Sequence, residues 1–349
     1  MFIGEEKIGL GNKCFMIAEV GQAHDGSLGM AHAYIDAISK TGVQAVKFQT
    51  HIAKAESSTE ERFRVKCFPQ DDSRYDYWKR MEFTHEQWQG LAAHANDKGL
   101  IFLSTPFSLE AAELLESLGI PAWKIGSGDV ENLPLIRKVA QTGKPVLLST
   151  GMSSWPEVDM AVTEISKRGS QTAVFQCTTA YPCSPEEIGL NLLNEIRERY
   201  MCPVGLSDHS GTIYPGLAAA SMGVSLLETH VVLSRDCFGP DVSASLTIDE
   251  VSQLVEGVRY TERMIAAPID KDKQSNRTKE LKVLFGRSIH AKNKLDKGHV
   301  LALDDLTFKK PGTGILGKDI DRILGKAVMR NYEQNEQLQE EDLYEPKDS

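Results

Sequence analysis

The sequence predicts an α/β protein, a (β/α)8 TIM barrel followed by a small C-terminal β domain. Eight short apolar runs occur within the first 265 residues. Amphipathic, helix-like stretches separate these runs, and this alternation is typical of a parallel sheet covered on its outside by helices. The chain has 349 residues. A barrel takes about 250 residues, so this length leaves room for a smaller second domain.

The apolar runs are the expected strands, and each ends in polar or small residues. They span residues 15–21, 45–50, 101–107, 122–129, 145–152, 173–178, 203–210 and 226–232. The expected helices include residues 30–40, 85–98, 109–118, 156–167 and 247–264, the last of which closes the barrel. A doubly wound open sheet is the alternative fold. Such a sheet normally carries a glycine-rich phosphate loop after its first strand, and EVGQAHDG matches that loop poorly.

One connection, residues 51–83, is much longer than the others and is rich in charged and aromatic side chains. Long connections of this kind are usually functional loops or lids. A surface excursion with its own helix is the other interpretation. We expect the barrel to occupy residues 1–266, a polar linker residues 267–282 and the second domain residues 283–349.

The composition argues against several classes of protein. The chain has 39 basic and 49 acidic residues, a net charge of −10, so general nucleic-acid binding is not expected. It has no run of about 18 apolar residues and no signal peptide at its start, so we expect a cytoplasmic protein without a membrane segment. None of its six cysteines has C-x-x-C spacing, so neither a structural zinc site nor a redox pair is indicated.

Polar side chains gather at the strand ends, where barrel enzymes carry their active sites. Lys47 and Lys124 lie in otherwise apolar strands, and a buried lysine is costly unless it is paired or faces a cavity. The two lysines could form salt bridges to Glu19 or Asp129, or neutralise a carboxylate cluster. They could instead bind an anion with several charges, helped by hydroxyl donors. The hydroxyl donors at the ends of the expected strands are Ser127, Ser149, Thr178 and Ser207.

Two histidines, His209 and His230, end the last two strands. Neighbouring strands lie about 4.8 Å apart, so these imidazoles could share one divalent ion. Mn²⁺, Mg²⁺ and Co²⁺ would all suit an open site completed by water and substrate oxygens. Each histidine could instead be a hydrogen-bonded core residue. The carboxylates available for acid–base work or for sugar hydroxyls are Glu19, Asp129, Asp208 and Asp241, and Asp241 could also be a turn residue.

A series of motifs runs in order from residue 17 to about residue 314. They are IAEVGQAHDG, VKFQTH, FLSTPF, WKIGSGDVENLP, LLSTGM, QCTTAYP, GLSDHS, LETHVVL, FGPDVSASL and KKPGTG. In this order they resemble the sialic acid synthases, which condense phosphoenolpyruvate with an amino sugar. The resemblance implies that the C-terminal domain is the antifreeze-like SAF module, a β-clip fold. It also implies a homodimer in which this domain is swapped and covers the partner's barrel.

The resemblance also implies a reaction. The methylene carbon of phosphoenolpyruvate would attack the aldehyde of an open-chain N-acetylated amino sugar. Water would add to the former enol carbon, and phosphate would leave with cleavage of its C–O bond. The default acceptor is N-acetylmannosamine, which gives N-acetylneuraminate. A 2,4-diacetamido-trideoxy hexose, which gives a legionaminate-type product, is the main alternative.

Site residues follow from the matched motifs. Lys47 and Lys124 would bind the phosphate and carboxylate of phosphoenolpyruvate, while His209 and His230 would bind the metal, with Mn²⁺ favoured. Lys310 would come from the partner and contact the N-acetyl group. Ser127, Ser149, Thr179 and Ser207 would lie around the two lysines, and Thr105 would be a further substrate-binding residue. The residues that would contact the sugar or move protons are Glu19, Gln49, Asp129, Tyr181 and Asp241.

Four positions depart from the common family pattern: Ala23, Asp129, Thr179 and Lys310. All lie on or near the sugar side, so they bear on the acceptor more than on the chemistry. Two other functions remain open. One is a Schiff-base aldolase with Lys124 or Lys47 as nucleophile, although such an enzyme needs no phosphate pocket. The other is a sugar-binding protein without activity, although both lysines, both histidines and Glu19 are present.

Overall fold

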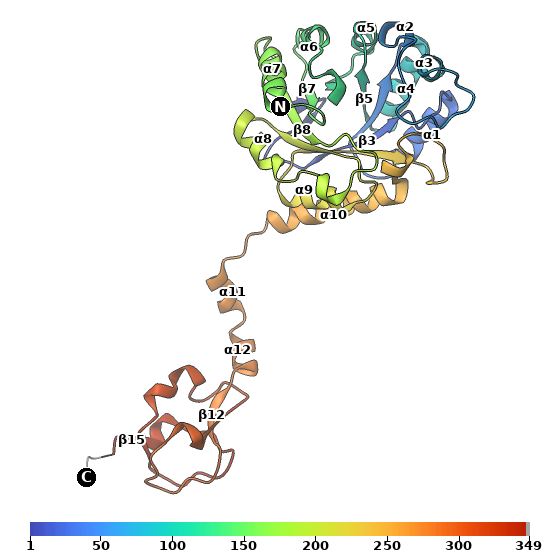
Figure 1. Cartoon of the computed structure of the whole chain (residues 1–349). Coiled ribbons are helices and arrows are strands. Elements are labelled where there is room, and N and C mark those ends of the chain that lie inside the picture. The colour runs from blue at the N-terminus through green and yellow to red at the C-terminus, as the bar shows by residue number, and fades with distance from the viewer. Residues whose placement is uncertain (347–349) are drawn as a thin grey trace. The chain divides into compact units, whose positions relative to one another are not determined.

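The computed structural model describes residues 1–346, and the chain divides after Ala266 into two compact units (Figure 1). The first unit is a parallel barrel in the hydrogen-bonded order β5-β4-β3-β10-β9-β8-β7-β6. The end strands β5 and β6 contact each other, so the ring is nearly closed and the predicted TIM barrel is confirmed. The strands are β3 (Phe15–Gly21), β4 (Ala45–Thr50), β5 (Ile101–Pro106), β6 (Trp123–Ile125), β7 (Val146–Ser149), β8 (Thr172–Cys177), β9 (Val204–Asp208) and β10 (Leu226–Val232).

Helices surround this barrel and bury one apolar face each against it. Helix α10, for example, buries Val251, Leu254 and Val258, and a capping box between Thr247 and Glu250 fixes its start. The barrel helices are α1 (Leu28–Ile38), α4 (His85–Asp97), α5 (Leu109–Ser117), α6 (Leu133–Ala140), α7 (Trp155–Ser166), α8 (Leu192–Tyr200), α9 (Tyr214–Ser221) and α10 (Ile248–Ile265). The expected strand at residues 122–129 is shorter than predicted, because residues Ser127–Asp129 form a 3-10 turn.

The barrel interior has an apolar end and a polar end. A short N-terminal hairpin, β1 (Phe2–Ile3) with β2 (Glu6–Lys7), was not predicted. Its Ile3, and Ile8 directly after it, pack with Ile17 and Leu226 inside the barrel. Successive side chains of a strand alternate between its two faces. The residues two positions further on, Glu19 and Glu228, therefore face the same interior nearer the C-terminal strand ends. This places the polar residues at the barrel mouth.

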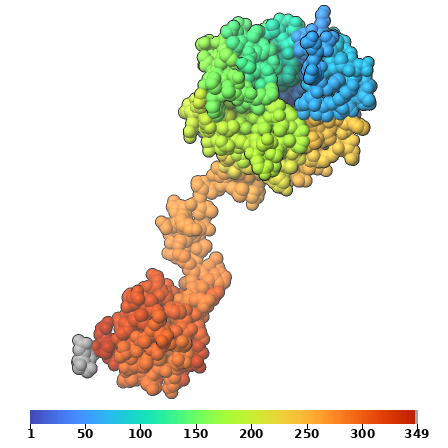
Figure 2. Space-filling model, viewed as in Figure 1, coloured from blue at the N-terminus to red at the C-terminus, as the bar shows by residue number. Residues whose placement is uncertain are grey.

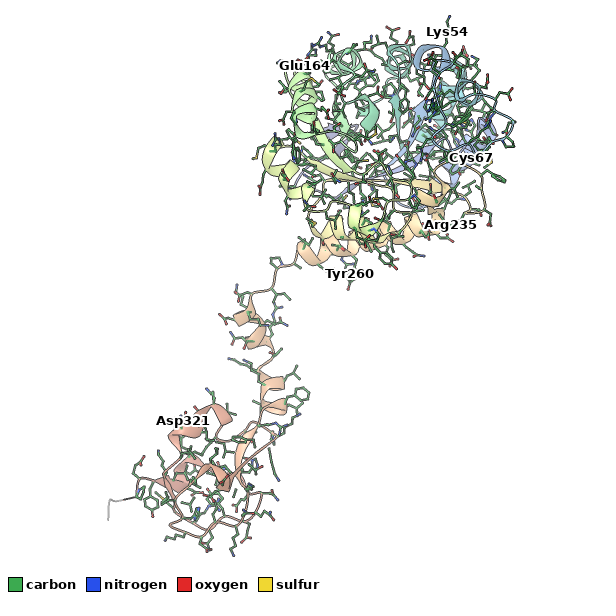
Figure 3. The ribbon with its side chains drawn as sticks, in the orientation of Figure 1. Lys54, Cys67, Glu164, Arg235, Tyr260 and Asp321 are labelled. Atoms are coloured by element: carbon green, nitrogen blue, oxygen red, sulfur yellow. The ribbon has the colours of Figure 1, made fainter. Side chains whose placement is uncertain are left out.

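The long connection carries two helices, α2 (Ala53–Glu56) and α3 (Arg74–Met81). We call residues 51–83 the insertion. It has its own small core, in which Phe68, Tyr77, Trp78 and Met81 are buried. Lys54 and Cys67, both in the insertion, lie on the same side of the first unit in Figure 3, and the insertion belongs to the blue surface in Figure 2.

The second unit begins at Ala267. Residues 267–282, expected to form a linker, contain α11 (Lys271–Arg277) and the start of α12 (Lys279–Phe285), neither of which buries a side chain. Two antiparallel pairs follow around a core that includes Ile289, Leu301 and Tyr332. The pairs are β12 (Ser288–Ala291) with β13 (Leu306–Lys309), and β14 (Ala327–Val328) with β15 (Leu343–Tyr344); short β11 (Leu246–Thr247) pairs with β10 in the barrel. None of the described helices has the length and apolar character that a membrane span requires.

Candidate active site

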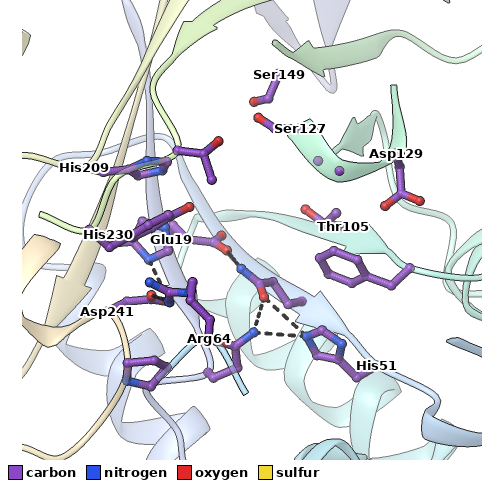
Figure 4. A pocket seen from close by; sticks show the side chains of 18 of the residues that line it. Glu19, His51, Arg64, Thr105, Ser127, Asp129, Ser149, His209, His230 and Asp241 are labelled. Atoms are coloured by element: carbon purple, nitrogen blue, oxygen red, sulfur yellow. Dashed lines mark hydrogen bonds and ion pairs between the residues drawn. The ribbon is translucent and has the colours of Figure 1, made fainter. Parts of the chain in front are cut away.

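A cavity of about 430 Å³ opens at the C-terminal ends of the barrel strands, a size typical of small-molecule sites (Figure 4). It is lined by all the residues of the first unit to which the matched motifs gave a role. These are Glu19, Lys47, Gln49, Thr105, Lys124, Ser127, Asp129, Ser149, Thr179, Tyr181, Ser207, His209, His230 and Asp241. Lys310 belongs to the second unit, directly after β13. The topology therefore brings together residues separated by more than two hundred positions.

Both lysines are paired with carboxylates at the floor of the cavity. The Nζ of Lys47 lies 2.7 Å from Glu19 Oε2 and donates to Thr105 Oγ1 at 3.1 Å. The Nζ of Lys124 donates to Glu228 Oε1 at 2.7 Å, and Lys47 Nζ lies 3.7 Å from the same oxygen. All four charged side chains are almost completely buried. The sequence suggested Asp129 as a possible partner, but the partners are Glu19 and Glu228.

The pairing controls the protonation of this cluster. Burial lowers the pKa of Lys47, but the carboxylates of Glu19 and Glu228 outweigh it, so the pKa is raised. Burial lowers the pKa of Lys124, which has Glu228 as its main counterion and Lys47 as a repelling neighbour. The pKa of Glu228 is lowered because the two ammonium groups overcome the effect of burial. Two cations thus balance two anions, which is the arrangement that makes buried charges tolerable.

Hydroxyl groups line the wall beside the lysines, and one of them lacks a partner. Ser149 Oγ is buried and has no hydrogen-bond partner among residues 1–346. Ser207 Oγ donates to Glu228 Oε1 at 3.3 Å, and Ser127 Oγ accepts from the Gly151 N–H at 2.9 Å. Thr178, expected among the donors, instead donates to the Glu187 carbonyl and does not line the cavity. A buried unpaired hydroxyl in a cavity that also holds two ammonium groups fits an oxygen of an anionic ligand.

The two histidines lie side by side, with ring centroids 5.2 Å apart. His209 Nδ1 lies 2.9 Å from the Thr178 carbonyl oxygen, which can only accept, so Nδ1 carries the proton and Nε2 is free. Burial, with a smaller effect of His230, lowers the pKa of His209 to about 3, so its ring is neutral. A backbone carbonyl that orients a neutral imidazole is the usual support of a metal ligand.

The two histidines fit an open divalent-ion site completed by water and substrate oxygens, and they do not fit a closed structural site. No group of three or more His, Cys, Asp or Glu side chains placed for metal binding occurs within residues 1–346. The nearest carboxylate oxygen to His230 Nδ1, Oδ2 of Asp241, is 4.0 Å away. Asp208, another predicted carboxylate, does not line the cavity and accepts hydrogen bonds from the Ser210 N–H and hydroxyl. Burial raises the pKa of Asp208 to about 6.

A hydrogen-bonded chain crosses the outer part of the cavity (Figure 4). Gln49 Nε2 donates to Glu19 Oε1 at 2.8 Å, and Gln22 Nε2 donates to Gln49 Oε1. His51 is stacked between Trp78 and Phe107, with centroids 3.9 Å and 4.5 Å away. Asp129 accepts from Asn132 Nδ2 at 2.9 Å, and burial raises its pKa. This region offers amide, carboxyl and aromatic groups, which is the mixture that a sugar requires.

Several charged residues that line the cavity were given no role from the sequence, and they are Glu56, Glu61, Arg64, Arg74 and Glu228. Glu228 lies two positions before His230 on the same strand, and this spacing is the signal that could have found it. Arg64 comes from the insertion and forms an ion pair with Asp241. No sequence pattern assigns Arg64 to the site, because the course of a long loop depends on its tertiary contacts. The insertion both carries its own helices and lines the cavity.

Comparisons with known proteins agree with this geometry. A model of the NeuB family matches residues 34–270, and a model of the SAF domain matches residues 286–343. The N,N'-diacetyllegionaminic acid synthase of Campylobacter jejuni is 32% identical, with 94% of this chain and 99% of that protein covered. The human N-acetylneuraminate-9-phosphate synthase is 31% identical, with 96% and 94% covered. A crystal structure of the sialic acid synthetase of Leptospira borgpetersenii has a TM-score of 0.72 and 26% identity, and covers 81% of this chain and 95% of that one.

Proposed function

The chain belongs to the NeuB family of phosphoenolpyruvate-condensing synthases, and from this premise we propose that it joins phosphoenolpyruvate to N-acetylmannosamine. The new C–C bond forms between the methylene carbon of phosphoenolpyruvate and the aldehyde carbon of the sugar. Water supplies the oxygen that adds to the former enol carbon, and the C–O bond to phosphate breaks. The products are N-acetylneuraminate and inorganic phosphate. One observation carries this proposal: two buried, paired lysines and the unpaired Ser149 hydroxyl line the same cavity.

Phosphoenolpyruvate occupies the floor of the cavity in this proposal. An ammonium group has three N–H donors, so Lys47 and Lys124 can keep their carboxylates and still donate to a substrate oxygen. Lys124 Nζ donates to only one acceptor among the described residues, Glu228. The neighbouring donors are Thr105, Ser127, Ser149, Thr179 and Ser207. Together they provide the point charges and short hydroxyls that a phosphate and a carboxylate require.

His209 and His230 hold the divalent ion, for which we propose Mn²⁺, with Mg²⁺ and Co²⁺ as alternatives. When bound, such an ion acts as a Lewis acid that polarises a carbonyl group. The neutral ring of His209 leaves Nε2 available for it, as described above. Glu19, Gln49 and Tyr181 surround the position where the sugar's reacting end would lie, and Asp129 and Asp241 are the carboxylates available to its hydroxyls or to protons.

A second acceptor, the 2,4-diacetamido-trideoxy hexose, is favoured by one specific observation. Phe63, Val65, Phe68 and Met152 give the outer wall of the cavity an apolar lining. A deoxy sugar with an additional acetyl group presents more apolar surface to such a wall than N-acetylmannosamine does. The C. jejuni relative is named as a legionaminic acid synthase.

The acceptor is tested by phosphate release from phosphoenolpyruvate in the presence of Mn²⁺. We expect release with N-acetylmannosamine, none without a sugar, and none after chelation of the metal. If phosphate is released only with the diacetamido sugar, that sugar is the acceptor in place of N-acetylmannosamine, and the reaction class is unchanged. A folded, metal-loaded protein that releases phosphate with neither sugar would contradict the proposal. Borohydride with pyruvate should trap no lysine adduct, whereas a Schiff-base aldolase would be trapped.

Lys310 provides a test of the proposed swapped dimer. In this proposal, Lys310 of the partner subunit contacts the N-acetyl group of the acceptor. The domain that carries it covers the site and excludes water. Lys310→Ala should raise the KM of the amino sugar about tenfold, the effect of one lost charged hydrogen bond, and leave the KM of phosphoenolpyruvate unchanged. Equal losses for both substrates would contradict this role. Mixed dimers of Lys310→Ala and His230→Ala chains should recover part of the activity, because one of their two sites is intact.

A further inference from the structure

We propose that Arg64 of the insertion is a positioning residue of the acceptor site, because it holds Asp241 and Tyr181 in place beside the two histidines. The proposal rests on the synthase function proposed above and adds a specificity-determining residue to it. The insertion thereby becomes part of the sugar site and is more than a surface excursion. The evidence consists of the anchoring of the insertion, the contacts of Arg64 and the charges around them.

The insertion is held firmly at several points. The Arg80 guanidinium donates to both carboxylate oxygens of Asp71, at 2.9 and 2.7 Å, and also binds Asp25 in the loop after β3. Glu82 Oε1 accepts from the Ala53 N–H at 2.8 Å, which joins the two ends of the insertion. Glu61 accepts from Trp78 Nε1 at 3.0 Å. The segment that carries Arg64 is therefore anchored at Glu61, three residues before it, by Trp78 of α3.

Arg64 reaches from this segment to two other loops of the barrel mouth. Its guanidinium forms an ion pair with Asp241, which follows β10, and its Cζ lies 4.4 Å from the ring centroid of Tyr181, which follows β8. Tyr181 in turn stacks on His209, with centroids 4.1 Å apart. Asp241 Oδ2 lies 4.0 Å from His230 Nδ1. Arg64 thus contacts both Tyr181, which stacks on His209, and Asp241, which lies beside His230.

The chemistry of arginine suits this task. A planar guanidinium can lie over an aromatic ring and donate to a carboxylate at the same time, which a lysine ammonium cannot do in the same geometry. The Asp241 side chain is 15% exposed and the Arg64 side chain 39% exposed. Without Arg64, the Asp241 carboxylate loses its closest cation and is free to turn toward His230. The Tyr181 ring loses the group that covers one of its faces.

The effect should fall on the sugar and not on phosphoenolpyruvate. Lys47 and Lys124, which bind phosphoenolpyruvate in the proposed function, are held by Glu19 and Glu228. Within residues 1–346, neither lysine forms a hydrogen bond or ion pair with Arg64, whose ion pair is with Asp241. Tyr181 and Asp241 are residues assigned to the sugar side. A change at Arg64 should therefore raise the KM of the amino sugar and leave the KM of phosphoenolpyruvate unchanged. A general loosening of the barrel would affect both.

The test is steady-state kinetics of the full chain with each substrate varied in turn. Arg64→Ala should raise the KM of the amino sugar about tenfold or more, with the KM of phosphoenolpyruvate unchanged. Arg64→Lys should recover only part of this loss, because it restores the charge and not the planar contact. Arg62→Ala is the matched control. Arg62 is an exposed arginine two positions away in the same segment, it does not line the cavity, and its replacement should change neither KM.

A double-mutant cycle separates positioning from direct contact. If Arg64 acts through Asp241, then Arg64→Ala should add little to the loss caused by Asp241→Asn. Fully additive losses, or an Arg64→Ala enzyme with the kinetics of Arg62→Ala, would overturn the inference. The wild-type enzyme distinguishes this failure from that of the proposed function. If the wild type turns over no acceptor, the function is wrong; if it does and Arg64→Ala is indistinguishable from it, only the role of Arg64 is wrong.

Discussion

We expect His230→Ala to abolish turnover while the barrel keeps its fold. His230 lies near the C-terminal end of β10, at the cavity, where its ring meets His209 and Tyr181 edge to face. Loss of an ion that polarises the reacting carbonyl removes several kcal/mol of transition-state stabilisation, which is about a thousandfold in rate. Phosphate release and Mn²⁺ binding, measured on the same preparation, should both fall.

A control histidine shows whether this loss belongs to the site. His94 lies on α4, away from the cavity, and makes contacts to His32 and Asp36. His94→Ala should retain turnover and Mn²⁺ binding. If His230→Ala keeps its activity without added metal, the assignment of His230 as a ligand is wrong. A thermal transition close to that of the wild type would show that the loss is chemical and not due to unfolding.

Much of the site could be predicted because strand geometry is strict. In a parallel barrel, every second residue faces the interior and all strands end at the same rim. The position of a polar residue near the end of an apolar run, such as Lys47 or His230, is therefore predictable: it lies at the barrel mouth. The same rule explains why Glu19 and Lys47 are directly opposite each other in register. The last barrel helix, expected at residues 247–264, is α10 (Ile248–Ile265) with Thr247 as its N-cap.

The remaining features depend on tertiary contacts that no local pattern encodes. The sequence suggested Glu19 or Asp129 as partners of the lysines, whereas Lys124 pairs with Glu228, 104 positions away, which only the barrel brings near it. Asp129 lies on a turn that directs it toward Asn132. The position of Arg64 depends on anchors such as Arg80 with Asp71, which the sequence shows only as scattered charges. Loops and buried ion pairs are thus less predictable than strand ends.

The second large effect concerns Lys124, where stability and activity should be lost together. Within residues 1–346, Lys124→Ala leaves the buried Glu228 carboxylate with one ion-pair partner, Lys47 at 3.7 Å. Removal of one partner of a buried ion pair costs about 3–5 kcal/mol of unfolding free energy. We therefore expect a clear loss of stability in denaturant titrations. Binding of phosphoenolpyruvate should also be lost, since the proposed site loses one of its two ammonium groups.

A double variant separates these two losses. Lys124→Met with Glu228→Gln removes both charges of the pair and leaves Lys47 with Glu19, at 2.7 Å. Replacement of a whole buried pair by uncharged groups is often neutral for stability, so most of the unfolding free energy should return. Phosphoenolpyruvate binding should not return, because the ammonium group is still missing. If the double variant regains both stability and turnover, Lys124 only balances Glu228 and does not bind the substrate. If the double variant regains stability but not turnover, Lys124 binds the substrate in addition to balancing Glu228.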